Sequence, residues 1–308
     1  MNQILLEQTK DLCRQLEIVP TKSKGQNFLV SEKILDQIAG AAELNQKDAV
    51  LEIGPGLGVL TEKLVERAGI VVAVELDRKL FGYLSDKFKG VKNLELIEGD
   101  IIKLLNGQIV KLLGNGEYKV VANLPYQITS HILRLLLEGA PTTLSASAFT
   151  TAAIPPSTNL ADRRAGGETH APSEMVLMVQ KEVGERICAK PGEMSVLAVM
   201  VQYYSQPEII AIVGKENFWP RPEVDSVVLR IKTLKHKSIK TKEKEQDFFK
   251  LVKVGFSGKR KMLKNNLRNV YEEEMVLDVL DQLGLSPKVR AEDLGVEEWV
   301  ELYKKLGK

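Results

Sequence analysis

Cysteine is scarce in this chain of 308 residues, and long hydrophobic runs are absent. Cys13 and Cys188 match no metal-ligand spacing and cannot build a disulfide framework. The longest apolar runs, such as residues 70–74 and 175–179, have the length of a strand and are too short to cross a bilayer. The first residues lack the basic region and sustained apolar core of a signal peptide. We therefore expect a soluble cytoplasmic protein with no metal and no membrane partner.

Positive charge gathers in one part of the chain. The net charge is only +2, but residues 232–264 hold eleven Lys and one Arg against three acidic residues, a local charge of +9. The remainder then carries −7. Such asymmetry indicates either a basic surface presented to a polyanion or a solvated linker and helix face, and charge alone does not decide between them.

The apolar segments predict an α/β domain followed by a smaller one. Five strands alternate with helical segments and favour a parallel sheet covered on both faces: residues 49–53, 70–75, 94–98, 119–122 and 175–180. A helix near 194–204 and two strands, 208–213 and 224–231, follow, with a Pro-containing hairpin connection between the strands. Beyond Thr233 the pattern is helical and basic. We expect residues 1–233 to form an N-terminal arm and the main domain, and 234–308 a small helical domain.

The N-terminal region combines two predicted helices with a basic arm. Residues 5–16 have the pattern of an amphipathic helix, and residues 21–29 form the arm. Ser31 is a candidate N-cap for a helix that runs to about Ala42.

Residues 139–173 do not fit the pattern of the sheet. Ala, Thr, Ser, Pro and Gly make up 25 of these 35 residues, and none is Lys. The segment lacks helical and strand periodicity, so we expect a mobile inserted loop. It connects a helix to a strand, which places it at the amino ends of the strands, away from the ligand-binding edge of such sheets.

A glycine-rich turn follows the first strand, in the sequence Leu-Glu-Ile-Gly-Pro-Gly-Leu-Gly of residues 51–58. Gly54 and Gly56 let the chain turn tightly and let a ligand touch the backbone. Glu75 ends the second strand, where an acid can bind ribose hydroxyls, and Asp100 follows the third, where a carboxylate can accept an adenine amino group. This arrangement favours S-adenosylmethionine, although an ordinary turn or a dinucleotide site is compatible with the glycines alone. Glu52 is either a ligand contact or a salt-bridge partner.

The sequence Asn-Leu-Pro-Tyr of residues 123–126 ends the fourth strand and is more specific. The amino nitrogen of adenine is a poor nucleophile because its lone pair is delocalised into the ring. The Asn123 side-chain oxygen and the Leu124 carbonyl can accept hydrogen bonds from its N–H groups and favour a pyramidal nitrogen. Pro125 fixes the backbone. Tyr126 can stack on a base swung out of its helix.

These motifs resemble those of the rRNA adenine N6,N6-dimethyltransferases, and within them the bacterial KsgA/RsmA type that acts on small-subunit (16S) rRNA. The resemblance spans nearly the whole chain except residues 139–173. It is carried by six segments: 25–29 (Gly-Gln-Asn-Phe-Leu), 51–58, 98–100 (Glu-Gly-Asp), 123–126, 218–226 (Phe-Trp-Pro-Arg-Pro-Glu-Val-Asp-Ser) and 256–261 (Phe-Ser-Gly-Lys-Arg-Lys). It implies a class I S-adenosylmethionine-dependent methyltransferase, with a Rossmann-like, mostly parallel sheet of seven strands and a C-terminal helical domain.

The resemblance also implies residue roles. The positions that contact the methyl donor map onto Asn27, Leu29, Gly54, Gly56, Glu75, Asp100 and Asn123. The catalytic set maps onto Asn123, Leu124, Pro125, Tyr126 and Phe218, with Phe218 expected to stack near the target base. The expected contacts to rRNA phosphates are Lys259, Arg260, Lys261, Lys264 and Arg268. The basic arm, with Lys22 and Lys24, is a further candidate for this surface.

The implied reaction is the dimethylation of two adjacent adenosines in the loop of the 3′-terminal hairpin of 16S rRNA, within a precursor of the small subunit, by a monomer. Three alternatives stay open. They are a large-subunit (23S) rRNA adenine N6-methyltransferase of the antibiotic-resistance type, a non-catalytic ribosome-assembly factor, and a nicotinamide oxidoreductase. The oxidoreductase leaves residues 123–126 unexplained, and the complete 218–226 motif favours the small-subunit enzyme.

Overall fold

The computed structural model describes residues 3–20, 26–105, 109, 112–113, 117–138, 171–234, 238–239 and 241–307. Its centre is a seven-stranded sheet with the strand order β4-β3-β2-β5-β6-β9-β7. The strands are β2 (Ala49–Ile53), β3 (Ile70–Glu75), β4 (Leu94–Glu98), β5 (Tyr118–Asn123), β6 (Glu174–Gln180), β7 (Ser205–Val213) and β9 (Ser226–Thr233).

The first five strands of that order run parallel, and only β9 pairs antiparallel with its neighbours β6 and β7. The predicted parallel strands and the terminal hairpin are therefore confirmed. The chain order reverses between β2 and β5, because the connections run outward from β2 on one side and from β5 on the other. The carboxyl ends of strands at such a reversal form the crevice in which α/β sheets bind ligands.

Both faces of the central strands β2, β3, β5 and β6 are largely buried, which explains why these strands are mostly apolar. Val50 packs in a cluster with helices α2 (Glu32–Ala41) and α3 (Val59–Arg67), whereas Leu51 belongs to the core on the other face. That second face is covered by α7 (Thr129–Glu138), α8 (Lys181–Ile187) and α9 (Val196–Tyr204). Helices α4 (Arg78–Lys87) and α5 (Ile101–Leu104) follow β3 and β4.

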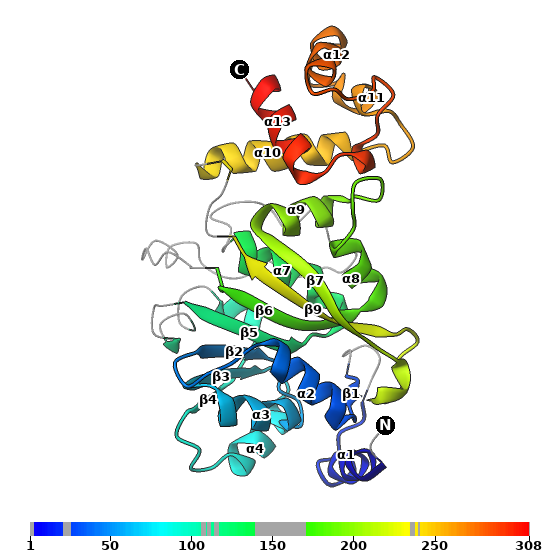
Figure 1. Cartoon of the computed structure of the whole chain (residues 1–308). Helices are drawn as coiled ribbons and strands as arrows, with labels where there is room; N and C mark the ends of the chain where they lie inside the picture. The colour runs from blue at the N-terminus through cyan, green and yellow to red at the C-terminus, as the bar shows by residue number, and fades with distance from the viewer. Residues whose placement is uncertain are drawn as a thin grey trace.

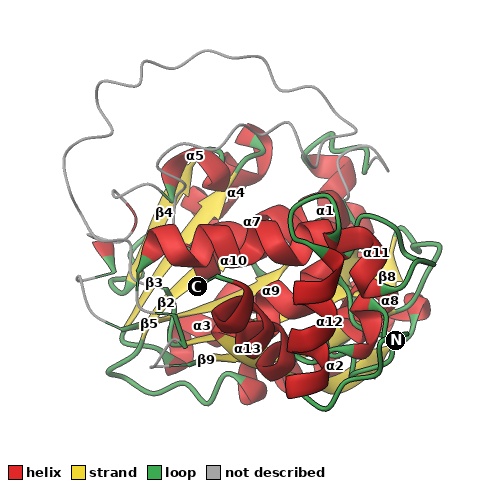
Figure 2. Ribbon diagram, turned by 90° about the horizontal axis from the view of Figure 1, so that it is seen from above, coloured by secondary structure: helices red, strands yellow, loops and turns green. Residues whose placement is uncertain are grey.

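The C-terminal helices pack on α9 at one end of the molecule, opposite α1 (Gln3–Gln15) (Figure 1). Tyr203 of α9 lies 5.1 Å from Phe248, between ring centroids, and Trp299 is fully buried in the same core. Figure 2 shows α10 and α13 above α9 and the sheet. These helices are α10 (Lys242–Gly255), α11 (Leu263–Leu267), α12 (Glu273–Gln282) and α13 (Val296–Leu306). The strands end at Thr233, and the division into two domains at that point stays a prediction.

A small second sheet joins two distant segments. Strands β1 (Phe28–Leu29) and β8 (Phe218–Trp219) pair antiparallel, with Phe28 opposite Trp219 and Leu29 opposite Phe218. The 25–29 and 218–226 segments therefore meet in space. They lie on the same side of the molecule as α11 in both views (Figure 1, Figure 2).

Ser31 occupies the N-cap position of α2, and Ala42 is its C-cap, so the predicted position and extent of this helix are confirmed, although the Ser31 side chain makes no capping hydrogen bond. The Ser31 backbone carbonyl accepts from the N–H groups of Ile34 and Leu35.

The inserted segment lies outside the described residues, except for its last three. Of these, Ser173 bonds to the carbonyl of Tyr118 at the amino end of β5. No helix in the described part of the chain is long and apolar enough to span a membrane.

Candidate active site

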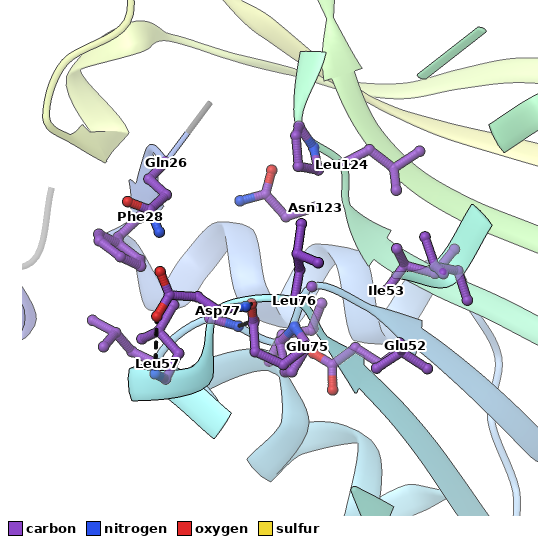
Figure 3. A pocket seen from close by; sticks show the side chains of 18 of the residues that line it. Gln26, Phe28, Glu52, Ile53, Leu57, Glu75, Leu76, Asp77, Asn123 and Leu124 are labelled. Atoms are coloured by element: carbon purple, nitrogen blue, oxygen red, sulfur yellow. Dashed lines mark hydrogen bonds between the residues drawn. The ribbon is translucent and has the colours of Figure 1, made fainter. Parts of the chain in front are cut away.

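A cavity of about 570 Å³ opens at the carboxyl ends of β2, β3 and β5, at the reversal of strand order. Its volume is within the range of small-molecule sites. It brings together ten of the predicted site residues: Asn27, Leu29, Gly54, Gly56, Glu75, Asp100, Asn123, Leu124, Pro125 and Tyr126. Figure 3 shows the Asn123 side chain between those of Gln26 and Leu124, above Glu75 and Leu76.

The glycine turn forms the floor of this cavity. Gly54 and Gly56 have φ angles of +67° and +61°, in the left-handed region that a side chain disfavours. An added Cβ at Gly54 would meet no atom within 4 Å, so the space beside this backbone is open to a ligand. The turn is therefore a cradle in which a bound molecule can approach the main chain.

Two carboxylates face the cavity from the ends of β3 and β4. Glu75 accepts hydrogen bonds from the backbone N–H groups of Gly56 (3.0 Å) and Asp77 (2.8 Å), which ties the second strand to the glycine turn. Burial raises the pKa of Glu75 above its usual range. Asp100 caps α5 by accepting from the N–H of Ile102 at 3.0 Å. Both side chains offer acceptors for hydroxyl and amino groups.

The Asn123 amide is oriented from outside its own strand. Its Nδ2 donates to the backbone carbonyl of Asn27 at 3.4 Å, which leaves Oδ1 as the acceptor of this side chain. The Pro125 carbonyl accepts from the N–H of Ile128 at 3.2 Å and from Oγ1 of Thr129 at 3.4 Å. The Leu124 carbonyl is therefore the better candidate for the second acceptor of a substrate amino group.

Tyr126 begins the short helix η2 (Tyr126–Ile128), and its hydroxyl lies 2.9 Å from Oγ of Ser226. Burial raises the pKa of Tyr126, so its hydroxyl stays protonated at neutral pH. Sequence reasoning did not single out Ser226, although it is the last residue of the 218–226 segment. Nor did it single out Thr9 of α1, which is buried and lines the same cavity.

Phe218 is not brought into the cavity. Its side chain is 4% exposed and packs in the apolar cluster with Leu29 and Ile34, beneath the small sheet. No face of the ring is free in this structure to stack on a base. Its neighbour Trp219 instead lies opposite Phe28 in the small sheet, and Phe28 lines the cavity. Phe218 thus supports β1, and the predicted stacking role has no support from this geometry.

Glu52 lies beneath the glycine turn. It is 1% exposed, and one of its carboxylate oxygens has no hydrogen-bond partner in the described structure. Burial raises its pKa to about 8. No ion pair of Glu52 occurs among the described residues, so the salt-bridge alternative finds no partner there. Glu52 also lines the cavity, so the ligand contact stays a prediction.

The predicted RNA-contacting residues belong to the C-terminal helical region, which lies at the end of the molecule opposite α1 (Figure 1). Lys259, Arg260 and Lys261 are exposed on the loop between α10 and α11, and Arg268 is exposed just after α11. Lys264 is half-buried and forms an ion pair with Glu273 at 2.8 Å.

Asn266 fixes the shape of that loop. It is 3% exposed, and its amide donates to the carbonyls of Gly255 and Gly258. Lys259, Arg260 and Lys261 therefore lie on a turn that hydrogen bonds hold in shape, whereas Lys264 is paired with the Glu273 carboxylate. Lys22 and Lys24 of the basic arm lie outside the described residues.

Within the described residues, no group of three or more His, Cys, Asp or Glu side chains could hold a metal ion. The cavity therefore offers hydrogen-bond donors and acceptors and a backbone cradle as its chemical groups.

Comparisons with known proteins agree with this site. A profile of the family described as "Ribosomal RNA adenine dimethylase" matches residues 20–308. The chain is 39% identical over 300 residues to "Ribosomal RNA small subunit methyltransferase A" of Dehalococcoides mccartyi, covering 97% of this chain and 92% of that one. It is 40% identical over 307 residues to the protein of the same name from Moorella thermoacetica, covering 97% and 96%.

Solved structures show the same fold. A dimethyladenosine transferase from Plasmodium falciparum superposes with a TM-score of 0.69 at 25% identity, covering 91% of this chain and 98% of that one. The 23S rRNA methyltransferase ErmE gives a TM-score of 0.67 at 24% identity, covering 92% and 100%, a likeness that shows the fold alone. The predicted class I methyltransferase fold is thereby confirmed. The chain belongs to the ribosomal RNA adenine dimethylase family and is an rRNA adenine dimethyltransferase.

Proposed function

We propose that this enzyme uses S-adenosylmethionine to dimethylate the N6 amino groups of two adjacent adenosines in the 3′-terminal hairpin loop of 16S rRNA. The substrate would be a precursor of the small ribosomal subunit. The enzyme would act on it in the cytoplasm, as a monomer. The observation that carries the proposal is the meeting of Asn123, Leu124 and Tyr126 with Glu75 and Asp100 around one cavity. The names of the relatives support the small subunit as substrate.

The cavity fits the methyl donor on two counts. The open space beside Gly54 is a cradle that a side chain would fill, and Glu75 and Asp100 are acceptors at successive strand ends. Glu75 would hold ribose hydroxyls and Asp100 the adenine amino group, while Asn27 and Leu29 would close the site from β1. When bound, the donor would supply an electrophilic methyl group.

The protein's part in the chemistry is to prepare the target nitrogen. Oδ1 of Asn123 and the Leu124 carbonyl would each accept one N–H of the adenine amino group, which removes its lone pair from conjugation with the ring. Such acceptors are effective because they are already oriented before substrate binds. Asn27 holds the Asn123 amide, and Pro125 holds the backbone, with φ of −57° and ψ of 131°. Tyr126 would stack on the flipped base.

Phosphate contacts would come from the loop between α10 and α11. Lys259, Arg260 and Lys261 are exposed there, on the same side of the molecule as the small sheet (Figure 1). These contacts would position the rRNA without reading its bases. Arg268 would add to this surface, and Lys264 would contribute less because Glu273 already neutralises it.

Methyl transfer to separated ribosomal subunits tests the proposal. Labelled S-adenosylmethionine and purified enzyme would be offered small and large subunits that lack these modifications. We expect label in the small subunit. Label confined to the large subunit would favour the resistance-type alternative, and binding to small subunits without transfer would favour the assembly factor. The nicotinamide oxidoreductase is excluded because the chain belongs to the dimethylase family.

A further inference from the structure

The ring of Tyr126 is held at its far end by a buried serine. The two hydroxyl oxygens, of Tyr126 and Ser226, lie 2.9 Å apart, and either can be the donor. Ser226 has no exposed surface, whereas Tyr126 is half-buried and lines the cavity. The hydrogen bond therefore connects a group at the site to one that is wholly inside the fold.

Ser226 is held by pairing on both sides of its strand. It opens β9 and pairs on one side with Gln180 of β6 and on the other with Val213 of β7. The preceding residue, Asp225, accepts from the N–H of Lys215 through Oδ1 at 3.0 Å. The Asp225 carbonyl also accepts from the N–H of Lys181 at 2.9 Å. The backbone that carries the Ser226 hydroxyl is thus fixed on both sides.

The opposite end of the Tyr126 side chain is fixed by the backbone. The Leu124 N–H donates to the carbonyl of Met178 at 3.2 Å, and Asn123 is paired with the same residue in β6. Because β6 also pairs with β9, the backbone of residues 123–126 and the Ser226 hydroxyl belong to one rigid framework. A tyrosine held at both ends cannot swing about its first side-chain torsion, so the position of its ring is set before a base arrives.

We propose that Ser226 is a positioning residue, whose hydroxyl holds the Tyr126 ring in the place where the target adenine stacks on it. The inference rests on the proposed function, since it assigns a role in holding the base. It explains the last residue of the 218–226 segment by a contact at the site, whereas Phe218 at its start is buried in the core.

A double-mutant cycle tests the inference. Ser226→Ala, Tyr126→Phe and the double variant would be compared in methyl transfer to small subunits, with binding of S-adenosylmethionine measured by calorimetry. Each single change is expected to lower kcat about five- to tenfold, the equivalent of about 1–1.4 kcal/mol. The double variant is expected to lose no more than either single one, because all three lack the same hydrogen bond. Donor affinity should stay within about twofold of wild type.

A second readout separates positioning from stability. The second methyl transfer requires the loosened Tyr126 ring to hold a base that already carries one methyl group. This transfer should therefore slow, and N6-methyladenosine should accumulate relative to N6,N6-dimethyladenosine. Ser205→Ala is the matched control, since Ser205 is also buried and its hydroxyl donates to the Val201 carbonyl at 2.6 Å, at the far end of the β7–β9 pair. It should lower stability while leaving kcat and the product ratio unchanged.

Three results would overturn the inference. Wild-type kcat in Ser226→Ala would show that Tyr126 needs no anchor. A double variant that loses the product of the two single losses would show that the two residues act independently. A change of product ratio in Ser205→Ala would attribute the effect to general loosening. Absence of transfer by the wild-type enzyme would instead refute the proposed function, and the inference with it.

Discussion

Removal of the Asn123 amide is the sharpest perturbation of the proposed chemistry. In Asn123→Ala, one of two acceptors for the adenine amino group is lost and the Leu124 carbonyl remains. One pre-oriented hydrogen-bond partner in a transition state is worth roughly 2–4 kcal/mol, which corresponds to about 30- to 800-fold in rate. The cost to folding should be small, because the only hydrogen bond of this side chain in the described structure is the 3.4 Å contact to Asn27.

The assay is single-turnover methyl transfer to small subunits at saturating donor, together with a thermal melt. Asn93→Ala is the matched control, since the Asn93 amide donates to the carbonyls of Val65 (2.8 Å) and Ala68 (3.1 Å) at the opposite edge of the sheet. This control should lose stability and keep its rate. A rate for Asn123→Ala within threefold of wild type, in a folded protein that binds donor, would refute the role of the amide.

Three further predictions concern the RNA surface, Glu52 and the glycine turn. Replacing Lys259–Lys261 with Ala should weaken binding to small subunits and reduce the slope of log affinity against log salt by about 2–3, and an unchanged slope would move the RNA surface elsewhere. Because the pKa of Glu52 is raised from 4.5 to about 8, the folded protein favours its neutral form and loses stability as the pH rises through that interval. Glu52→Gln should therefore gain roughly 1–3 kcal/mol at pH 8 and little at pH 4.5, in urea unfolding at both values; a gain that is equal at both would contradict the assignment. Gly58→Ala should cost roughly 1–3 kcal/mol, since φ is +75° and the new Cβ would lie 2.7 Å from the ring of Phe88, while Gly40→Ala in an open helical position should be neutral or stabilising in the same melts.

The central strands of the sheet were predictable because they are buried on both faces. Val50 and Leu51 contact opposite cores, so β2 is apolar except for Glu52 and differs in pattern from the amphipathic helices around it. The glycine turn and the acids at the strand ends were predictable for a related reason. In a parallel sheet every carboxyl end reaches the same edge, so order along the chain is enough to gather Gly54, Glu75 and Asp100.

The site features that could not be predicted from the sequence depend on contacts between distant segments. Ser226 is 100 residues from Tyr126 in sequence, and nothing in the pattern around a strand serine predicts which distant residue its hydroxyl contacts. Thr9 lines the cavity only because α1 packs against Leu57 and Leu80 through Cys13. Phe218 shows the reverse case. A motif identifies a segment near the site, but which of its side chains points inward is decided by pairing, here with Leu29 in the small sheet.

The central claim is that adjacent adenosines of the small subunit receive two methyl groups each. Its most direct test is mass spectrometry of the 3′-terminal hairpin after exhaustive reaction of unmodified small subunits with purified enzyme and S-adenosylmethionine. We expect two neighbouring N6,N6-dimethyladenosines, four methyl groups per subunit, and at least about 30-fold slower formation of the product with Asn123→Ala. A single N6-methyladenosine, methylation at another site, or no methylation of the hairpin would contradict it.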